Sequence, residues 1–253
     1  MEIKHFVIII TLFLSFSCSK EPQKLREIKA SQININDSLS QVTEIENFIK
    51  PKRDYIKSDL NKVLCYNPEY LSKKAINLNT ALGNLMADIV YEQVNPIFHE
   101  RTQKDIDFVL LNYGGIRATI PEGNVTTRTA YEVMPFENSI EVVELPYEAI
   151  LKIADYLIKN KKAHPVSKQF HLEISPTDAI RNYTIKGEIP NKNQTYNVAT
   201  SDYLLSGGDN MEFFKDSIQT TSLDYLIRKA MIDYFAKQDT LKTATDKRLY
   251  LYK

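Results

Sequence analysis

Cysteine is nearly absent from this sequence of 253 residues, which contains only Cys18 and Cys65. Two cysteines cannot build a disulfide scaffold or a cysteine-rich metal site. An excess of one charge is also lacking, because 32 lysines and arginines balance 32 aspartates and glutamates. With no net positive charge, and no basic run longer than a pair such as Lys161 and Lys162, the chain lacks the electrostatic footprint of a nucleic-acid-binding protein. A DNA or RNA polymer is therefore not an expected partner.

The composition is otherwise typical of a water-soluble globular protein, with 43% hydrophobic and 25% charged residues. A chain of this length fits one large domain or two small ones, and its core needs no covalent cross-links. Patterns expected of common catalytic sites are missing: the sequence contains no Gly-x-Ser-x-Gly and no phosphate-binding Gly-Lys-Ser/Thr.

The first twenty residues form a separate region. An apolar run from Phe6 to Phe16 follows Lys4 and precedes Cys18. This run is shorter than the roughly 20 residues that span a bilayer, so it predicts a signal peptide. A cysteine at the end of such a run resembles a bacterial lipobox, in which Cys18 becomes the lipid anchor. The alternative is an ordinary cleaved signal whose cysteine is incidental.

The lipobox reading sets the expected domain organisation: a lipoprotein signal peptide at 1–17, a polar tether at 18–39 and one folded domain at 40–253. Diacylglycerol and an N-acyl chain on Cys18 supply more than one acyl chain, as stable membrane attachment requires. We therefore expect export across the inner membrane and a lipoprotein of the cell envelope, attached to the outer membrane. Cys65 is expected to be a free thiol.

Apolar periodicity predicts interleaved helices and strands after the tether, and hence an α+β domain with a mixed sheet and packed helices. A short helical stripe near 45–49 is expected to stop around Pro51, and a helix at 80–95 is expected to be capped by Asn79 or Thr80 and followed by Pro96. Further helices are predicted at 147–159 and 222–237. Strands are predicted at 106–111, where burial on both faces is expected, and at 140–145, 170–174, 183–189 and 196–200.

Three loops contain residues suited to binding a small molecule. Two of the seven glycines precede Arg117 after the strand at 106–111, which places a guanidinium where it can hold a phosphate or carboxylate. Phe136 follows a proline at the entrance of the next strand, where a ring can stack on a base. Asp209 follows a second glycine pair and can accept hydrogen bonds from ribose hydroxyls. Each loop alone also has a plainer interpretation. The first glycine pair would make a tight turn and Arg117 a surface salt bridge, Phe136 would be a core ring, and the loop before Asp209 would be an ordinary turn.

Together with residues 82–88, these loops resemble the C-terminal domain of the bacterial 5'-nucleotidases, a group that includes UDP-sugar hydrolase and the animal ecto-5'-nucleotidase. The motifs occur in the family's order and spacing, from about residue 45 to the end. The resemblance implies a single nucleotide-binding domain. It also implies a role for each matching residue. Arg117 would contact the phosphate, Phe136 and Tyr203 would sandwich the base, and Asn138 would contact the base. Asp209 would accept hydrogen bonds from the ribose hydroxyls, and Asn112 begins the glycine loop as the family's asparagine does.

Hydrolysis in that family belongs to an N-terminal metallophosphoesterase domain with two divalent metals. Such a centre needs histidines and aspartates in Asp-x-His, Gly-Asn-His-Glu and His-x-His runs, and none of these occurs in the sequence. His99, His164 and His171 are scattered and are expected on the surface or in strands. We therefore expect no catalytic residue, metal ligand or cofactor in this chain, with divalent metals in a partner phosphoesterase.

Four positions depart from the family pattern. Tyr113 replaces a glycine of the first loop, Glu137 replaces the glycine after Phe136, and Lys168 stands where a base-contacting glycine is common. Ile76 replaces a phosphate-binding arginine, with Lys73 and Lys74 nearby. These changes bear on ligand affinity and leave the expected fold unchanged.

Three functions follow from these observations. The first is the substrate-recognition half of a split 5'-nucleotidase in nucleotide catabolism, with catalysis supplied by a separate metallophosphoesterase polypeptide. The second is a stand-alone envelope lipoprotein that binds a nucleotide or nucleoside without a role in hydrolysis. The third, a hydrolase active alone, requires a metal site that the sequence does not show.

Overall fold

The structure is a computed structural model that describes residues 25–36, 38–74, 77–242 and 246–252. The chain divides into two units, residues 1–49 and 50–253. In the first unit, residues 25–36 contain no helix or strand. Helix α2 (Thr43–Leu60) has no buried residue. The expected signal peptide and the anchor residue Cys18 lie outside the described residues.

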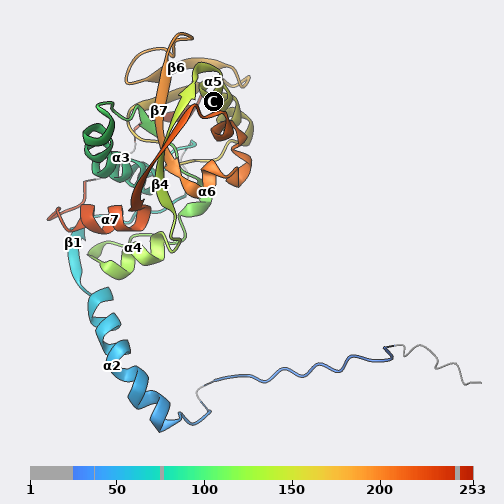
Figure 1. Ribbon diagram of the computed structural model, residues 1–253, viewed down its shortest axis with the longest axis vertical. Helices are drawn as coiled ribbons and strands as arrows, with labels where there is room; N and C mark the ends of the chain where they lie inside the picture. Colours follow the sequence, from blue (N-terminus) through green and yellow to red (C-terminus); the bar gives the residue numbers. More distant parts are fainter. Residues whose placement is uncertain (1–24, 37, 75–76, 243–245, 253) are drawn as a thin grey trace, which may run out of the picture. The chain divides into compact units, whose positions relative to one another are not determined.

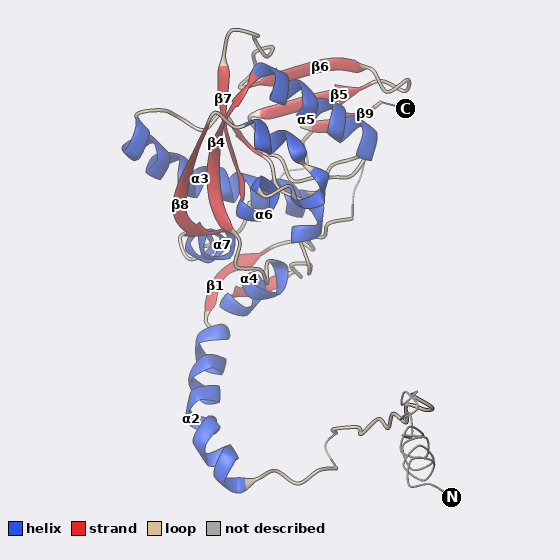
Figure 2. Ribbon diagram, turned by 45° about the vertical axis from the view of Figure 1, so that its right-hand side comes forward, coloured by secondary structure: helices blue, strands red, loops and turns tan. Residues whose placement is uncertain are grey.

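A four-stranded sheet in the order β2-β7-β4-β8 forms the centre of the second unit (Figures 1 and 2). Its strands are β2 (Phe108–Val109), β7 (Thr195–Ser201), β4 (Ser139–Pro146) and β8 (Gln219–Leu226). Strand β2 is parallel to β7, whereas β4 is antiparallel to both β7 and β8. The segments after β2, β7 and β8 and the segment before β4 therefore meet at one end of the sheet.

Successive side chains of a strand point to opposite sides, and in β2 and β4 the side chains on both faces are largely buried. In β2, Val109 faces one core and Phe108 the other; in β4, Val142 and Val143 divide in the same way. Helices α3 (Ala81–Thr102) and α7 (Ile227–Phe235) cover the first face, and α5 (Tyr147–Asn160) covers the second.

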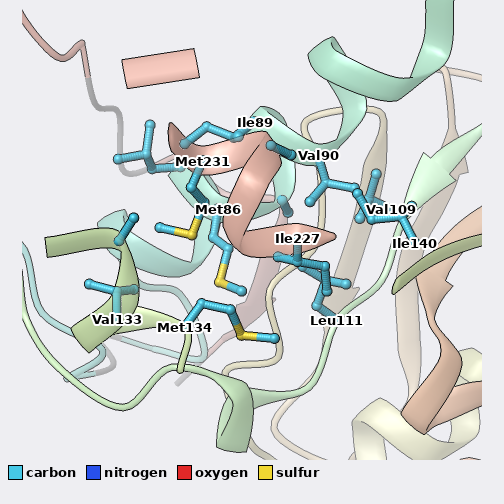
Figure 3. Close-up of a cluster of buried hydrophobic side chains, with 14 of the residues drawn as sticks. Met86, Ile89, Val90, Val109, Leu111, Val133, Met134, Ile140, Ile227 and Met231 are labelled. Carbon is cyan, nitrogen blue, oxygen red and sulfur yellow. The ribbon is translucent and has the colours of Figure 1, made fainter. Parts of the chain in front are cut away.

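The first core joins α3 and α7 to the segment that precedes β4. Figure 3 shows Met86 of α3 and Ile227 of α7 beside Met134, which is buried. The second core joins α5 to a three-stranded sheet in the order β6-β5-β9. The remaining elements complete the fold: β1 (Val63–Asn67), β3 (Gly123–Thr126), α4 (Thr127–Val133), β5 (Phe170–Ile174), β6 (Ile180–Ile185), α6 (Asp202–Leu205), β9 (Leu249–Leu251) and the 3-10 helices η1 (Tyr113–Gly115), η2 (Gly208–Asn210) and η3 (Glu212–Asp216).

The predicted α+β fold is confirmed, and most elements lie where periodicity placed them. Thr80 caps α3 as expected, with its side chain accepting a hydrogen bond from the Gly83 N–H at 2.8 Å. Strands β4, β5 and β7 and helix α5 match their predicted ranges to within a residue or two. Cys65 is a buried free thiol, and burial raises its pKa to about 11.

Both proline-based boundaries are wrong. Helix α2 continues through Pro51 to Leu60, and α3 continues through Pro96 to Thr102. A proline inside a helix removes one hydrogen bond and typically costs about 3 kcal/mol. In α3 the turn beyond Pro96 buries Phe98, and this burial offsets part of that cost.

Other predicted elements have different boundaries, or a different type of secondary structure, in the structure. Residues 222–226 belong to strand β8, so the helix expected at 222–237 begins only at Ile227. Strand β6 lies at 180–185 rather than at 183–189, and the buried segment 106–111 is a strand only over two residues. Within the described residues, no helix has the length and apolarity to cross a membrane.

Candidate functional site

The glycine-rich loop follows β2, and the side chain of Asn112 lies over its glycines. A Cβ atom on Gly115 would come 3.0 Å from Asn112 Oδ1, and one on Gly114 would come 3.3 Å from Asn112 Nδ2. The glycines leave the space that this amide occupies. Arg117 is exposed at the far end of the loop, and its backbone N–H donates to the Val133 carbonyl at 2.8 Å.

The loop before β4 presents Phe136 to solvent, with 43% of the residue exposed. The guanidinium carbon of Arg117 lies 5.8 Å from the centre of the Phe136 ring. Two residues further on, Asn138 Nδ2 donates to Asp202 Oδ1 at 2.8 Å. The plainer reading of Phe136 as a core ring is therefore wrong.

The loop after β7 holds Tyr203 and Asp209 against each other. The Tyr203 hydroxyl donates to Asp209 Oδ1 at 3.0 Å and accepts from the Asp209 N–H at 3.2 Å. The Tyr203 ring is covered on one side by Gly208, where a Cβ atom would come 2.5 Å from ring carbons. The residue remains 42% exposed.

The three loops are linked in pairs at one end of the sheet. Arg117 joins the first to the second, and Asn138 and Asp202 join the second to the third. Asp209 Oδ2 lies 3.9 Å from the Cβ position of Gly114, which places the third loop beside the first. We call residues 112–117, 134–138 and 202–209 the three-loop cluster. No ring contact joins Phe136 to Tyr203 in the described part of the chain, and their role as a base sandwich stays a prediction.

His164 lies beside the glycine loop and is neither on the surface nor in a strand, contrary to expectation. It is 3% exposed, and its Nδ1 accepts a hydrogen bond from the Tyr113 N–H at 3.2 Å. Burial lowers the pKa of His164 to about 4, against the nearby Asp209 charge, which raises it. The ring is therefore neutral near pH 7 and keeps its acceptor for the loop. His99 and His171 fit expectation, since they pair with Asp105 on the surface and with Glu173 in β5.

Two further residues hold the cluster, and no local sequence pattern marks either of them. Tyr156 of α5 donates its hydroxyl to the Asp209 carbonyl at 2.8 Å. Arg228 of α7 donates to the carbonyls of Pro135 and Phe136 at 2.9 and 3.2 Å. Tyr156 looks like a core residue of an amphipathic helix, and Arg228 fell in the middle of a predicted helix, where an arginine is normally solvated.

The structure shows the surroundings of three of the four positions that depart from the family pattern. Glu137 extends toward Arg228, with Oε1 accepting from Nη2 at 3.1 Å. Lys73 donates to the Ile116 carbonyl at 2.8 Å, and its ammonium lies 4.7 Å from the centre of the Tyr113 ring. Lys73 thus brings a second cation to the glycine loop. The Lys168 N–H donates to Asp88 Oδ1, and Ile76 lies outside the described residues.

Three hollows lie elsewhere on the surface, and none of the three is lined by a residue of the three-loop cluster. Their volumes are about 270, 510 and 660 Å³. Three charged pairs lie along their walls: Lys104 with Glu144, Lys186 with Asp107, and His171 with Glu173. Within the described residues Arg117 forms no ion pair with a carboxylate, so its exposed guanidinium is available to bind an anion. No group of three or more His, Cys, Asp or Glu side chains in the described residues could hold a metal ion.

Comparison with known proteins gives the family. The sequence model described as "5'-nucleotidase, C-terminal domain" matches residues 69–216, more than half of the chain. The chain belongs to this family. The match contains all three loops, whereas Arg228 lies beyond it.

The relatives and the solved structure compared below are considerably longer than this chain. An apyrase of Tabanus yao is 19% identical over 217 residues, covering 78% of this chain and 39% of the apyrase. Cell wall protein Lmo0130 of Listeria monocytogenes is 26% identical over 172 residues, covering 62% of this chain and 21% of that protein. The crystal structure of a 5'-nucleotidase precursor from Thermus thermophilus matches with a TM-score of 0.68 at 19% identity, covering 81% and 42% of the two chains. The chain thus spans about two fifths or less of these proteins, and the structural match establishes the fold.

Proposed function

We propose that the three-loop cluster binds a nucleoside monophosphate, as the substrate-recognition part of a split 5'-nucleotidase. The single observation that carries the proposal is the pairwise linkage of the three loops at one end of the sheet. This linkage gathers the exposed rings of Phe136 and Tyr203, the Arg117 guanidinium and the Asp209 carboxylate within a single surface region. Relatives named apyrase and 5'-nucleotidase support a nucleotide as the ligand.

Each part of a nucleotide has a matching group in the cluster. The base stacks between Phe136 and Tyr203, where each ring contributes about 1–3 kcal/mol. Asp209 Oδ2 accepts from a ribose hydroxyl, because Oδ1 is already bonded to Tyr203. Arg117 holds the phosphate with Lys73 as a neighbouring cation.

The rings are tested by calorimetric titration with AMP, adenosine and ribose 5-phosphate. Phe136→Ala is expected to weaken AMP and adenosine about tenfold and Tyr203→Ala by more than about tenfold, since one stacked base contributes about 1–3 kcal/mol. Ribose 5-phosphate, which has no base, changes little in Phe136→Ala, whereas Tyr203→Ala also loses the hydroxyl that holds Asp209 and weakens it about threefold to tenfold. Tyr55→Ala is the matched control, because Tyr55 is 75% exposed and lies on α2, outside the cluster. Absence of heat with all three ligands would reject the proposal.

The proposal places hydrolysis on a separate dimetal phosphoesterase, and these 253 residues contain the binding loops and none of the dimetal motif runs. Binding energy from the base and ribose then positions the phosphate for the partner's metals. Mixing this chain with a secreted phosphoesterase that carries those runs should release phosphate from AMP faster than either protein alone. No gain on mixing would favour the stand-alone nucleotide binder.

We also propose that the protein is a lipoprotein of the outer membrane, anchored through Cys18. In the producing bacterium, Cys18→Ser is expected to abolish labelling by palmitate and move the protein out of the membrane fraction. Cys65→Ser is the matched control, because Cys65 is the other of the two cysteines and is buried in the domain. Labelling that persists in Cys18→Ser would contradict the anchor.

A further inference from the structure

We propose that Arg228 is the residue that positions Phe136 for ligand binding, an inference that rests on the proposed function of the three-loop cluster. Arg228 lies in the first turn of α7, directly after the end of β8. Ser139 at the start of β4 pairs with Leu226 at the end of β8, so α7 begins beside the loop that carries Phe136. The Ile227 N–H reinforces this by donating to the Asn138 carbonyl at 3.1 Å.

The guanidinium group collects the carbonyls of three consecutive residues. Nη1 lies 2.9 Å from the Pro135 oxygen, 3.2 Å from the Phe136 oxygen and 3.4 Å from the Met134 oxygen. Three successive carbonyls turned toward one atom fix the path of the loop backbone. With its carbonyl turned inward to Arg228, Phe136 keeps its ring at the surface.

The other sides of the guanidinium are occupied as well. Nη2 donates to Glu137 Oε1 at 3.1 Å, and the Tyr131 ring lies 4.2 Å from the guanidinium carbon. The Arg228 side chain is 7% exposed, whereas Glu137 is 79% exposed. Glu137 therefore covers the arginine. This ion pair explains why a glutamate can stand where the family has a glycine.

The location of Arg228 indicates a specific role. A cation in the first turn of a helix faces the positive end of the helix dipole, and a buried charge needs compensation. The first turn of α7 contains no acidic residue. The compensation comes instead from three carbonyls and one carboxylate of the Phe136 loop and from the Tyr131 ring of α4. Loss of the arginine would leave these carbonyls without their donor and release the loop.

A fluorescent reporter tests the positioning without any ligand. The chain contains no tryptophan, so Phe136→Trp introduces a single indole into the loop. Adding Arg228→Met is expected to raise the acrylamide quenching constant of this indole about twofold and to lower its anisotropy, because the loop loses its anchor. Arg228→Lys should behave like Arg228→Met, because one ammonium cannot reproduce the planar fork that spans the carbonyls and Glu137.

Arg248→Met is the matched control. The Arg248 side chain is also buried, with 4% of it exposed, and pairs with Asp88 and Asp246, residues outside the three-loop cluster. Its loss should destabilise the fold and leave the quenching constant of the indole unchanged in the folded protein. A similar rise in both variants, or no rise with Arg228→Met and Arg228→Lys, would overturn the positioning role.

Ligand titration provides the second measurement. Without the reporter substitution, Arg228→Lys is expected to weaken AMP and adenosine about tenfold and ribose 5-phosphate less than about twofold, because only the ring that meets the base is displaced. Equal losses for all three ligands would contradict the inference. If the unchanged chain binds none of these ligands, the proposed function fails, and the quenching comparison alone decides whether Arg228 holds the loop.

Discussion

Gly208→Ala is expected to abolish measurable binding of both AMP and adenosine while the chain stays folded. A Cβ atom at residue 208 would come 2.5 Å from ring carbons of Tyr203 and 2.6 Å from its carbonyl oxygen. Rotation of the tyrosine ring relieves only the first of these clashes, because the second involves the backbone. The turn at 208–209 must therefore move away from Tyr203.

This movement would break two hydrogen bonds at once. The Tyr203 hydroxyl bonds both the carboxylate and the N–H of Asp209, and Asp209 sits in the left-handed region with φ of 52°. Displacing the turn removes the ring from the base and the carboxylate from the ribose together. Loss of one stacked base and one charge-assisted hydrogen bond amounts to about 2.5–6 kcal/mol, or a loss of affinity of about seventyfold or more.

Two comparison variants separate this mechanism from general damage. Gly187 has a φ of 83°, and a Cβ atom there would have no neighbour within 4 Å. Gly187→Ala is therefore expected to lower the free energy of unfolding by about 1 kcal/mol and to leave binding unchanged. Tyr203→Phe keeps the ring and loses only the hydroxyl, and a loss of about threefold to tenfold is expected. Calorimetry for binding and thermal unfolding for stability give both values. Unchanged AMP affinity in Gly208→Ala would contradict the role of the Tyr203 turn.

Local sequence patterns predicted the buried elements well, because burial leaves a periodic signature. Thr80 and the apolar face of α3 are examples, and the strand at 140–145 is another. Strand β8 was mistaken for helix because its residues are mostly exposed and its pairing with β4 is a long-range contact. The local sequence of residues 222–226 does not indicate that pairing.

The candidate site was predictable as separate loops, since glycine pairs and a proline mark their positions. Their convergence depends on strand directions: β2 and β7 run in parallel and β4 runs against them. The expectation that the loops form one site came from the family resemblance, because local periodicity contains no information on strand directions. His164 and Arg228 were missed for a related reason, because each acts on backbone atoms of a loop distant in sequence.

Arg117→Ala is expected to weaken AMP about tenfold to a hundredfold and adenosine less than about threefold. Hydrogen bonds to a charged group contribute about 1.5–3 kcal/mol, and only AMP carries the phosphate that would receive them. The substitution should hardly alter stability, because the Arg117 side chain is exposed and its backbone N–H keeps the bond to Val133. Added salt should weaken AMP binding in the parent chain more than in Arg117→Ala, because salt screens the charge interaction that the variant lacks.

Arg181→Ala is the matched control for the arginine-ring geometry. Arg181 lies over Tyr252 at 4.0 Å, as Arg117 lies over Phe136 at 5.8 Å, but it belongs to β6 and not to the three-loop cluster. Its removal should leave the affinities for AMP and adenosine unchanged. Equal losses of AMP and adenosine in Arg117→Ala would mean that the guanidinium supports the Phe136 ring and does not bind phosphate. A selective loss of AMP would instead place the phosphate beside the glycine loop, because the Arg117 backbone is fixed there by its bond to Val133.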